Sequence, residues 1–103
     1  MITTFADFVT RVAEEINDVF EAYGLFYLET YETQTERDGQ TYKGVMIQSN
    51  LKDALCCSAF YLEAAYENYK SQKYDLTEFA VDTVKQFFDD FGDEIKEAID
   101  NRE

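Results

Sequence analysis

Apolar residues near the start of the chain recur every three or four positions, which is the spacing of one face of an α-helix. They make one continuous stripe: Phe5, Phe8, Val9, Val12, Ile16, Val19, Phe20 and Tyr23. The hydroxyl of Thr3 or Thr4 can cap the first turn, and Gly24 suits the left-handed position that follows a helix. The pattern predicts a first helix that ends at Gly24.

From Leu25 the pattern changes to one typical of strands. The stretch LFYLETYETQT is rich in aromatic and β-branched residues and alternates after its first positions. Asp38 and Gly39 form a turn dipeptide that favours a tight hairpin. The following TYKGVMIQS predicts a second strand. Residues 25–49 are therefore expected to form an antiparallel hairpin.

The next segment allows two interpretations. Residues 55–62 have the composition of a third strand, and residues 63–71 then look helical, with Tyr66 and Tyr69 on one side. A single helix over residues 52–71 is the alternative. The sequence leaves both interpretations open.

A long amphipathic helix is predicted at the C-terminal end of the chain. Asp75 precedes Leu76 and is followed three positions later by Glu78, a variant of the capping box. The apolar stripe of this helix contains Ala80, Val84, Phe87, Phe88, Phe91, Ile95, Ala98 and Ile99. Gly92 is expected to kink or divide the helix, because glycine costs about 1 kcal/mol relative to alanine in a helix interior.

These elements predict a single α+β domain over residues 1–103, in the order α-β-β-(β)-α-α. The economical architecture is a small antiparallel sheet of two or three strands with helices packed on one face. A chain of 103 residues buries about two-thirds of the surface that it exposes when unfolded. We therefore expect it to fold without disulfides or metals.

The chain is strongly acidic, with 22 acidic residues against nine basic ones and a formal net charge of -13. Phosphate contacts need Lys and Arg, so this balance disfavours direct binding to nucleic acid or to an anionic membrane. It suits a basic protein partner, because opposite fields steer association, although it would also serve solubility alone. Residues 75–103 hold ten acids and three bases, over half of the net charge.

The residues that most catalytic and metal sites require are missing. Histidine is absent, which excludes a His-based triad or zinc site. Cys56 and Cys57 are adjacent, a spacing that matches neither zinc-binding pairs nor a redox C-x-x-C, and we interpret them as small apolar residues in a reducing cytoplasm. We expect no catalytic residue, metal or cofactor, and thus no enzyme. The N-terminus lacks the pattern of a signal peptide, and no apolar run approaches a membrane span.

Acids of the C-terminal helix form the candidate partner-binding surface. Helical spacing gathers four aspartates and Lys96 on one face, and three more acids flank it. These residues, called the acidic ridge, are Asp82, Asp89, Asp90, Asp93, Glu94, Glu97 and Asp100. Like charges at four-residue spacing weaken a helix, and a local stability cost can mark function. A solvated helix face is the alternative. The run DDFGDE at 89–94 has the acids and glycine of a calcium loop, but the helical pattern argues against one.

Four tyrosines crowd into one region: Tyr61, Tyr66, Tyr69 and Tyr74. Tyrosine is enriched at protein interfaces because its ring is apolar and its tip polar, but the edge of a core is the favoured interpretation here. The alternative function built on these residues is a structural or self-associating domain. It would form a homodimer through its aromatic strands and the tyrosine cluster.

The order of the elements resembles a family of short gut-bacterial proteins of unknown function. The matching residues are the hairpin glycines and the residues of FYLEAAYENYK, namely Gly39, Gly44, Tyr61, Leu62, Tyr66 and Tyr69. The resemblance covers most of the chain and implies no catalytic residues. The chain departs from the family pattern in having no proline before Tyr61 and no glycine near Gln72.

The general profile is also similar to that of phage and mobile-element inhibitors such as anti-CRISPR proteins, which are small, acidic and free of enzymatic motifs. Several of those inhibitors occupy the nucleic-acid groove of a basic nuclease with carboxylates arranged like phosphates. The resulting hypothesis is a non-enzymatic inhibitor that docks the acidic ridge on a basic groove of a nucleic-acid-handling enzyme, such as a CRISPR effector nuclease. Its carboxylates would pair with Arg and Lys in place of phosphate oxygens.

Overall fold

A computed structural model describes residues 4–51, 56–72 and 75–100. The elements, in chain order, are α1 (Phe5–Ala22), β1 (Leu28–Arg37), β2 (Gln40–Ser49), β3 (Cys57–Tyr61), α2 (Glu63–Gln72) and α3 (Leu76–Asp100). The strands form one antiparallel sheet in the order β1-β2-β3. The protein is therefore α+β, and the predicted order is confirmed with the third strand present.

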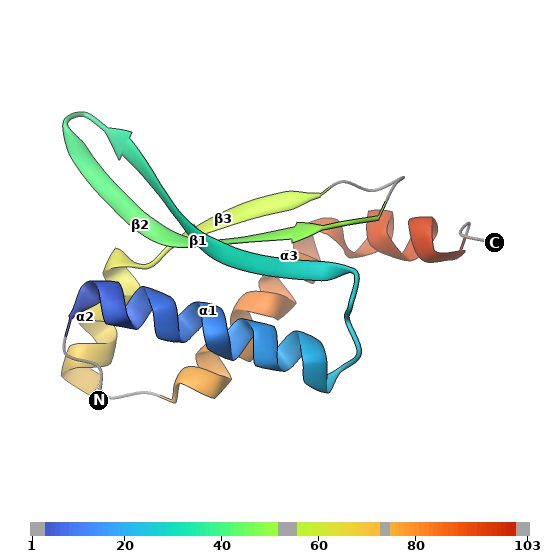
Figure 1. The fold of residues 1–103 in the computed structure, drawn as a ribbon, viewed down its shortest axis with the longest axis horizontal. Helices are drawn as coiled ribbons and strands as arrows, with labels where there is room; N and C mark the ends of the chain where they lie inside the picture. Colours follow the sequence, from blue (N-terminus) through green and yellow to red (C-terminus); the bar gives the residue numbers. More distant parts are fainter. Residues whose placement is uncertain (1–3, 52–55, 73–74, 101–103) are drawn as a thin grey trace.

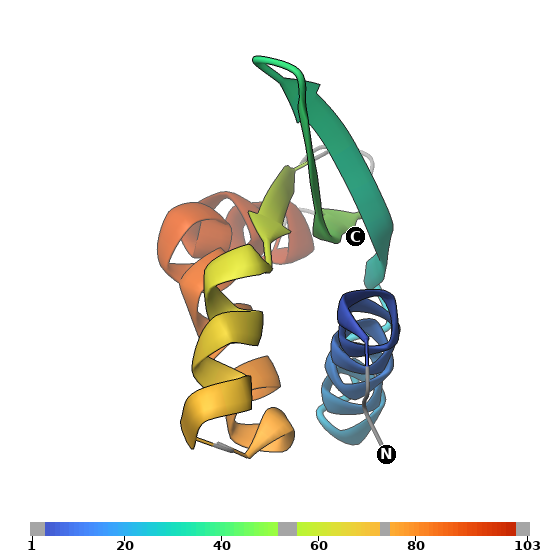
Figure 2. The ribbon, with the colours of Figure 1, turned by 90° about the vertical axis from the view of Figure 1, so that its left-hand side faces the viewer.

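The helices form one layer and the sheet the other. Figures 1 and 2 show all three helices on the same side of the sheet, with the turn of the β1–β2 hairpin rising away from them. α1 contacts β1, β2, α2 and α3, so it packs against the sheet and against both other helices. This arrangement leaves the opposite face of the sheet without a covering helix in the described part of the chain.

Two local signals of the sequence are confirmed. The hydroxyl of Thr4 accepts a hydrogen bond from the amide of Asp7 at 3.1 Å, which caps the first turn of α1. At the hairpin, Asp38 and Gly39 have φ angles of 54° and 80°. Two successive residues with positive φ make a type I′ turn, whose twist matches that of the flanking strands. The turn sets the register that pairs β1 with β2.

The end of α1 differs from the prediction in two details. Gly24 has a φ of 67°, and the amide of Leu25 donates to the carbonyl of Phe20 at 2.8 Å, which closes a Schellman motif. Because this motif uses Leu25, β1 begins at Leu28 and not at residue 25. Tyr23, placed in the apolar stripe by its spacing, is 70% exposed because it lies beyond the last helical residue.

The ambiguous segment forms a strand followed by a helix. Residues 57–61 pair with β2, and α2 begins two residues later at Glu63. The alternative of one helix over residues 52–71 is therefore wrong for 57–61, where ladder hydrogen bonds replace helical ones. Residues 52–55 lie outside the described part of the chain.

The tyrosine cluster is divided between two surfaces. The rings of Tyr66 and Tyr69 each lie 5.2 Å from the ring of Phe8, and both are half-buried, so they lie at the edge of the core as favoured. Tyr61 instead lies on the sheet, with its ring 6.5 Å from that of Tyr42. Tyr74 is outside the described residues.

The core lies between the helix layer and the inner face of the sheet. Its largest fully buried side chains are Phe8, Phe87, Ile16, Ile47, Leu62, Ile95, Val12 and Val45. α3 supplies two of them and is one helix from Leu76 to Asp100, so Gly92 does not divide it. Figure 1 shows that the axis of α3 nevertheless turns part-way along.

The outer face of the sheet is poor in charge. Val45 and Ile47 are completely buried against the helices, so alternate positions of all three strands face outward. The tyrosines on this outer face are Tyr31, Tyr42 and Tyr61. Among its described strand residues, only Glu29 and Arg37 carry charged side chains.

Candidate protein-binding surface

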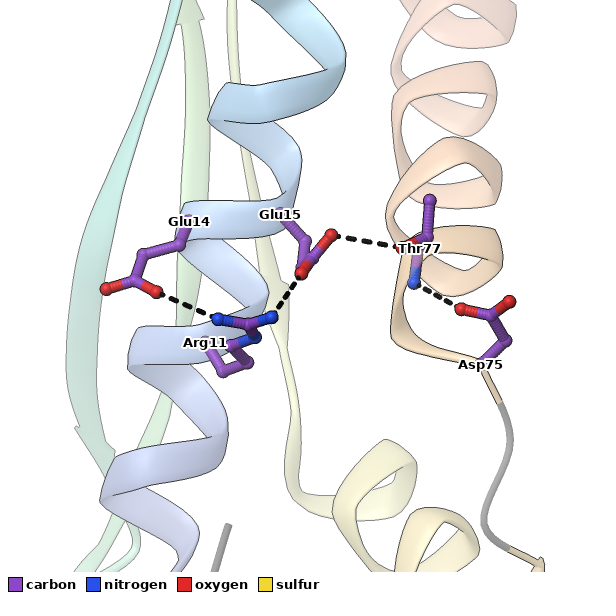
Figure 3. Close-up of polar contacts among 5 residues, drawn as sticks. All are labelled: Arg11, Glu14, Glu15, Asp75 and Thr77. Carbon is purple, nitrogen blue, oxygen red and sulfur yellow. Dashed lines mark hydrogen bonds and ion pairs between the residues drawn. The ribbon is translucent and has the colours of Figure 1, made fainter. Parts of the chain in front are cut away.

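The start of α3 is held against α1 by a chain of polar contacts (Figure 3). Arg11 forms ion pairs with Glu15 at 2.9 Å and with Glu14 at 3.6 Å. The second oxygen of Glu15 accepts a hydrogen bond from the hydroxyl of Thr77 at 3.1 Å, and the Thr77 amide donates to Asp75 Oδ1 at 2.8 Å. Asp75 thus caps α3 as its position predicts, and the contacts fix the helix that carries the acidic ridge.

Every side chain of the acidic ridge is exposed. α3 turns its apolar stripe to the core, where Ala80 and Phe87 are completely buried and Ile95 nearly so. The ridge occupies the solvent side of the same helix because an amphipathic helix separates its apolar and charged residues by turns. The structure therefore brings the predicted binding residues onto one element, facing outward.

The described lysines and arginines do not neutralise the ridge. Arg11 pairs within α1, and Lys70 pairs with Glu67 of α2 at 3.1 Å. Lys85 and Lys96 lie on α3 itself, yet in the described part of the chain no ion pair involves a ridge carboxylate. These carboxylates are therefore available to cations from another molecule.

Two residues of the ridge line different grooves. One, of about 630 Å³, lies between α1 and α3, with Val19 and Phe88 in its apolar wall and Asp89 at its side. The other, of about 470 Å³, lies between β3 and α3 and includes Asp82. The ridge is thus not one uniform surface: Asp89 belongs to the apolar groove against α1, whereas Asp82 belongs to the groove beside the sheet.

Glu94 contacts the beginning of β3. The thiol of Cys56 donates to Glu94 Oε2 at 3.4 Å, and the amide of Cys56 donates to the hydroxyl of Ser49 at 3.0 Å. Burial, and next the hydrogen bond and negative charge of Glu94, raise the pKa of the Cys56 thiol above its ordinary value. A thiol held in its protonated form is a poor nucleophile, so the interpretation of Cys56 as a small buried residue fits its surroundings.

The acids that the structure describes do not assemble into a metal site. Residues 89–94, the run compared with a calcium loop, lie inside α3. Over the described ranges, no group of three His, Cys, Asp or Glu side chains is arranged to hold a metal ion. What the ridge can do chemically is accept hydrogen bonds and ion pairs at a solvent-exposed surface.

The groove between β3 and α3 was not singled out from the sequence. Its residues Ala59, Thr83 and Gln86 are small or uncharged and carry no motif. The sequence contains only an indirect signal of this groove. Residues 55–62 have the composition of a short strand, and a short strand at the edge of a sheet has unpaired backbone groups on its outer side.

Comparisons with protein-family models, with curated proteins and with solved structures give no match. The resemblance to the gut-bacterial family therefore stays a prediction. Within the residues that the structure describes, no helix combines the length and the apolar character that crossing a membrane requires.

Proposed function

We propose that the protein is a non-enzymatic inhibitor that binds a basic groove of a nucleic-acid-handling enzyme through its acidic ridge. The proposed target class includes CRISPR effector nucleases, by the similarity of profile to anti-CRISPR proteins. Carboxylates of α3 would occupy the positions of phosphate oxygens and accept hydrogen bonds from Arg and Lys of the enzyme. The proposal requires no catalytic group, and it predicts competition with nucleic acid.

The observation that carries the proposal is a row of exposed carboxylates that form no ion pair within the described part of the chain. From Asp82 to Asp100 the helix rises about 27 Å, at about 1.5 Å per residue, so the seven acids supply one negative charge per ~4 Å. After subtraction of Lys85 and Lys96 the spacing is about 5 Å. A single DNA strand carries one charge per about 3.4 Å. The charge density of the ridge is thus comparable to that of a single strand.

The test is inhibition of DNA binding and cleavage by purified CRISPR effector nucleases. We expect the protein to displace labelled DNA from its target, more effectively at low salt than at high salt, because screening weakens exposed charge pairs. The triple variant Asp89→Asn, Asp90→Asn, Asp93→Asn should lose at least about tenfold in affinity if each amide removes roughly 0.5 kcal/mol or more of charge pairing.

The control removes the same charge elsewhere. Asp18→Asn, Glu21→Gln and Glu36→Gln change three exposed carboxylates on α1 and β1. This variant should inhibit nearly as well as the wild type. Equal losses in both variants would mean that net charge, and not the ridge, drives binding. An affinity that is the same at low and high salt, and the same in the wild type and the ridge variant, would contradict the mimicry itself.

The outer face of the sheet favours a second candidate function, self-association. Tyr31 and Tyr61 are 43% and 42% exposed there, on a face with very few charges. Two copies joined by this face would keep their acidic helices apart and avoid like-charge contacts. Light scattering across a range of concentrations tests this, because a dimer weakened by Tyr31→Ser and Tyr61→Ser would favour a structural role.

A further inference from the structure

We propose that the free edge of β3 is a docking site for an extended, lysine- or arginine-bearing segment of the protein's partner, which adds to the sheet as a fourth strand. The inference rests on the proposed function, since it names the part of a basic partner that would bind and the place that receives it. It adds backbone hydrogen bonds to the charge pairing of the acidic ridge.

The first argument is the direction of the β3 amides. The amide of Ser49 donates to the carbonyl of Cys56 at 2.9 Å, and the amide of Leu62 donates to the carbonyl of Lys43 at 3.0 Å. In an antiparallel ladder, hydrogen-bonded pairs alternate with pairs that are not. The register between these two contacts therefore directs the N–H and C=O groups of residues 57, 59 and 61 away from β2. In the described part of the chain, no other strand pairs with that edge.

The second argument is the position of the groove beside this edge. Successive residues of a strand point to opposite faces of the sheet. The groove nevertheless touches Ala59 and Tyr61, which face outward, and also Phe60, which faces inward. A hollow in contact with both faces lies at the side of the strand. Phe79 and Thr83 form its opposite wall, so the edge borders a trough between β3 and α3.

The third argument is the charge along the trough. Asp82 is the charged residue among its lining side chains, and Glu94 contacts Cys56 at the other end of β3. Residues 82, 86, 90 and 94 follow one another at four-residue spacing, so Asp90 lies between these two acids along the length of α3. A strand added to β3 would run from Asp82 at one end to Glu94 at the other, which suits lysine or arginine side chains on the added strand.

The same charge argues against a second copy as the occupant. Two β3 edges paired with each other would bring two copies of α3 close together, with like charges at both ends of the trough. An uncharged or acidic peptide would leave the carboxylates unpaired. Strand addition takes its affinity from main-chain hydrogen bonds and its specificity from alternate side chains, so the free edge favours an extended segment and the carboxylates favour basic side chains on it.

The probe for the test is a short fluorescein-labelled peptide of alternating lysine and valine, followed by fluorescence anisotropy at low salt. We expect it to bind the wild-type protein, and an otherwise identical peptide with alternate amides N-methylated on its pairing edge to bind at least about tenfold more weakly, which is ~1.4 kcal/mol. Hydrogen exchange followed by NMR should show new protection at residues 57, 59 and 61, and unchanged protection at 58 and 60.

Two variants at one position separate the backbone from the side chain. Ala59→Pro removes one outward amide, a change that edge strands tolerate, and should weaken binding about as much as N-methylation does. Ala59→Ser keeps the amide and measures the effect of the changed side chain alone, so a loss in Ala59→Pro beyond that of Ala59→Ser is assigned to the amide. Circular dichroism checks that both variants fold, and the N-methylated peptide gives the same answer without altering the protein.

The outcomes distinguish this inference from the proposed function. Two outcomes would overturn strand addition and leave the ridge proposal intact. One is peptide binding that weakens with salt but gives no new protection at 57, 59 and 61. The other is equal binding of the N-methylated and unmethylated peptides. No binding of the peptide to the wild type would also overturn it. A peptide-free dimer that Ala59→Pro dissociates would assign the edge to a second copy instead. Failure of the ridge proposal is read separately, from the nuclease assay.

Discussion

At Gly44 the sheet has no room for a side chain. A Cβ atom there would overlap the carbonyl oxygen of Phe60 and would lie 2.7 Å from the Cα of Tyr61. Both neighbours are backbone atoms of β3, which cannot rotate away as a side chain can. The absence of a Cβ therefore allows β2 and β3 to approach as closely as they do, next to the end of β3 that borders the trough.

We expect Gly44→Ala to destabilise the protein by about 2 kcal/mol, within the range that forced overpacking costs in a core. Urea denaturation measures the change. If Gly44→Ala proved neutral, β3 would have to be able to shift away from β2, and the trough between β3 and α3 would not have the shape described.

Cys56 gives the stability of the protein a pH dependence. The pKa of its thiol is raised in the folded state by burial and by Glu94, so the folded chain holds this proton more tightly than the unfolded chain does. The resulting stabilisation is complete below the thiol's ordinary pKa of 9.0 and is lost as the pH rises from there through the raised value. The loss thus begins on the alkaline side of neutrality.

Cys56→Ala should flatten this alkaline decline in the free energy of unfolding, which denaturation at a series of pH values measures. Cys57→Ala is the matched control: Cys57 is exposed, and its charge is the smallest of the causes that raise the pKa of the Cys56 thiol, so this variant should change the slope far less. Burial also raises the pKa of Tyr27, so the wild type and both variants share its contribution and the difference between them isolates the thiol. Equal slopes in the wild type and Cys56→Ala would refute the assignment.

Among the elements, α3 combines the greatest length with a residue that disfavours helix. Gly92 lies inside it, and a Cβ atom at Gly92 would lie 3.9 Å from Phe88, an ordinary contact distance. Glycine is tolerated there because the helix has neighbours to pack against, and the packing outweighs the intrinsic preference.

Gly92→Ala should raise the free energy of unfolding by about 0.5–1 kcal/mol, because alanine restricts the unfolded chain and favours helix without a clash. Urea denaturation beside Gly44→Ala gives opposite signs for two glycine substitutions in one protein. A loss of stability in Gly92→Ala would mean that the turn in the axis of α3 needs glycine at this position.

The elements that the sequence predicts best are those whose ends are determined by interactions between residues close together in the chain. α1 has Thr4 and Gly24 at its ends, and the hairpin has Asp38 and Gly39 at its turn, so short-range hydrogen bonds and φ preferences decide them. The described ends of β3 have no capping residue or turn dipeptide of this kind. Its strand conformation depends on pairing with β2, a long-range contact that composition alone suggests only weakly.

For the molecule as a whole, the acids of the candidate site could be predicted from helical spacing, and the structure confirms that they lie exposed on one helix. The placement of Asp82 and Asp89 in two different grooves could not be predicted from the sequence, because it depends on how α3 packs against α1 on one side and lies beside β3 on the other. Asp82 and Asp89 look equivalent in the sequence and acquire different neighbours only through tertiary packing.

The charge-poor outer face of the sheet has a consequence for encounters in solution. With the helix layer strongly negative and the opposite surface nearly neutral, the centre of negative charge is displaced from the centre of mass, which gives the molecule a permanent electric dipole. A cationic surface would exert a torque on this dipole before any contact forms and would rotate the helices toward itself. Collisions would then begin in the productive orientation, with the hairpin trailing behind.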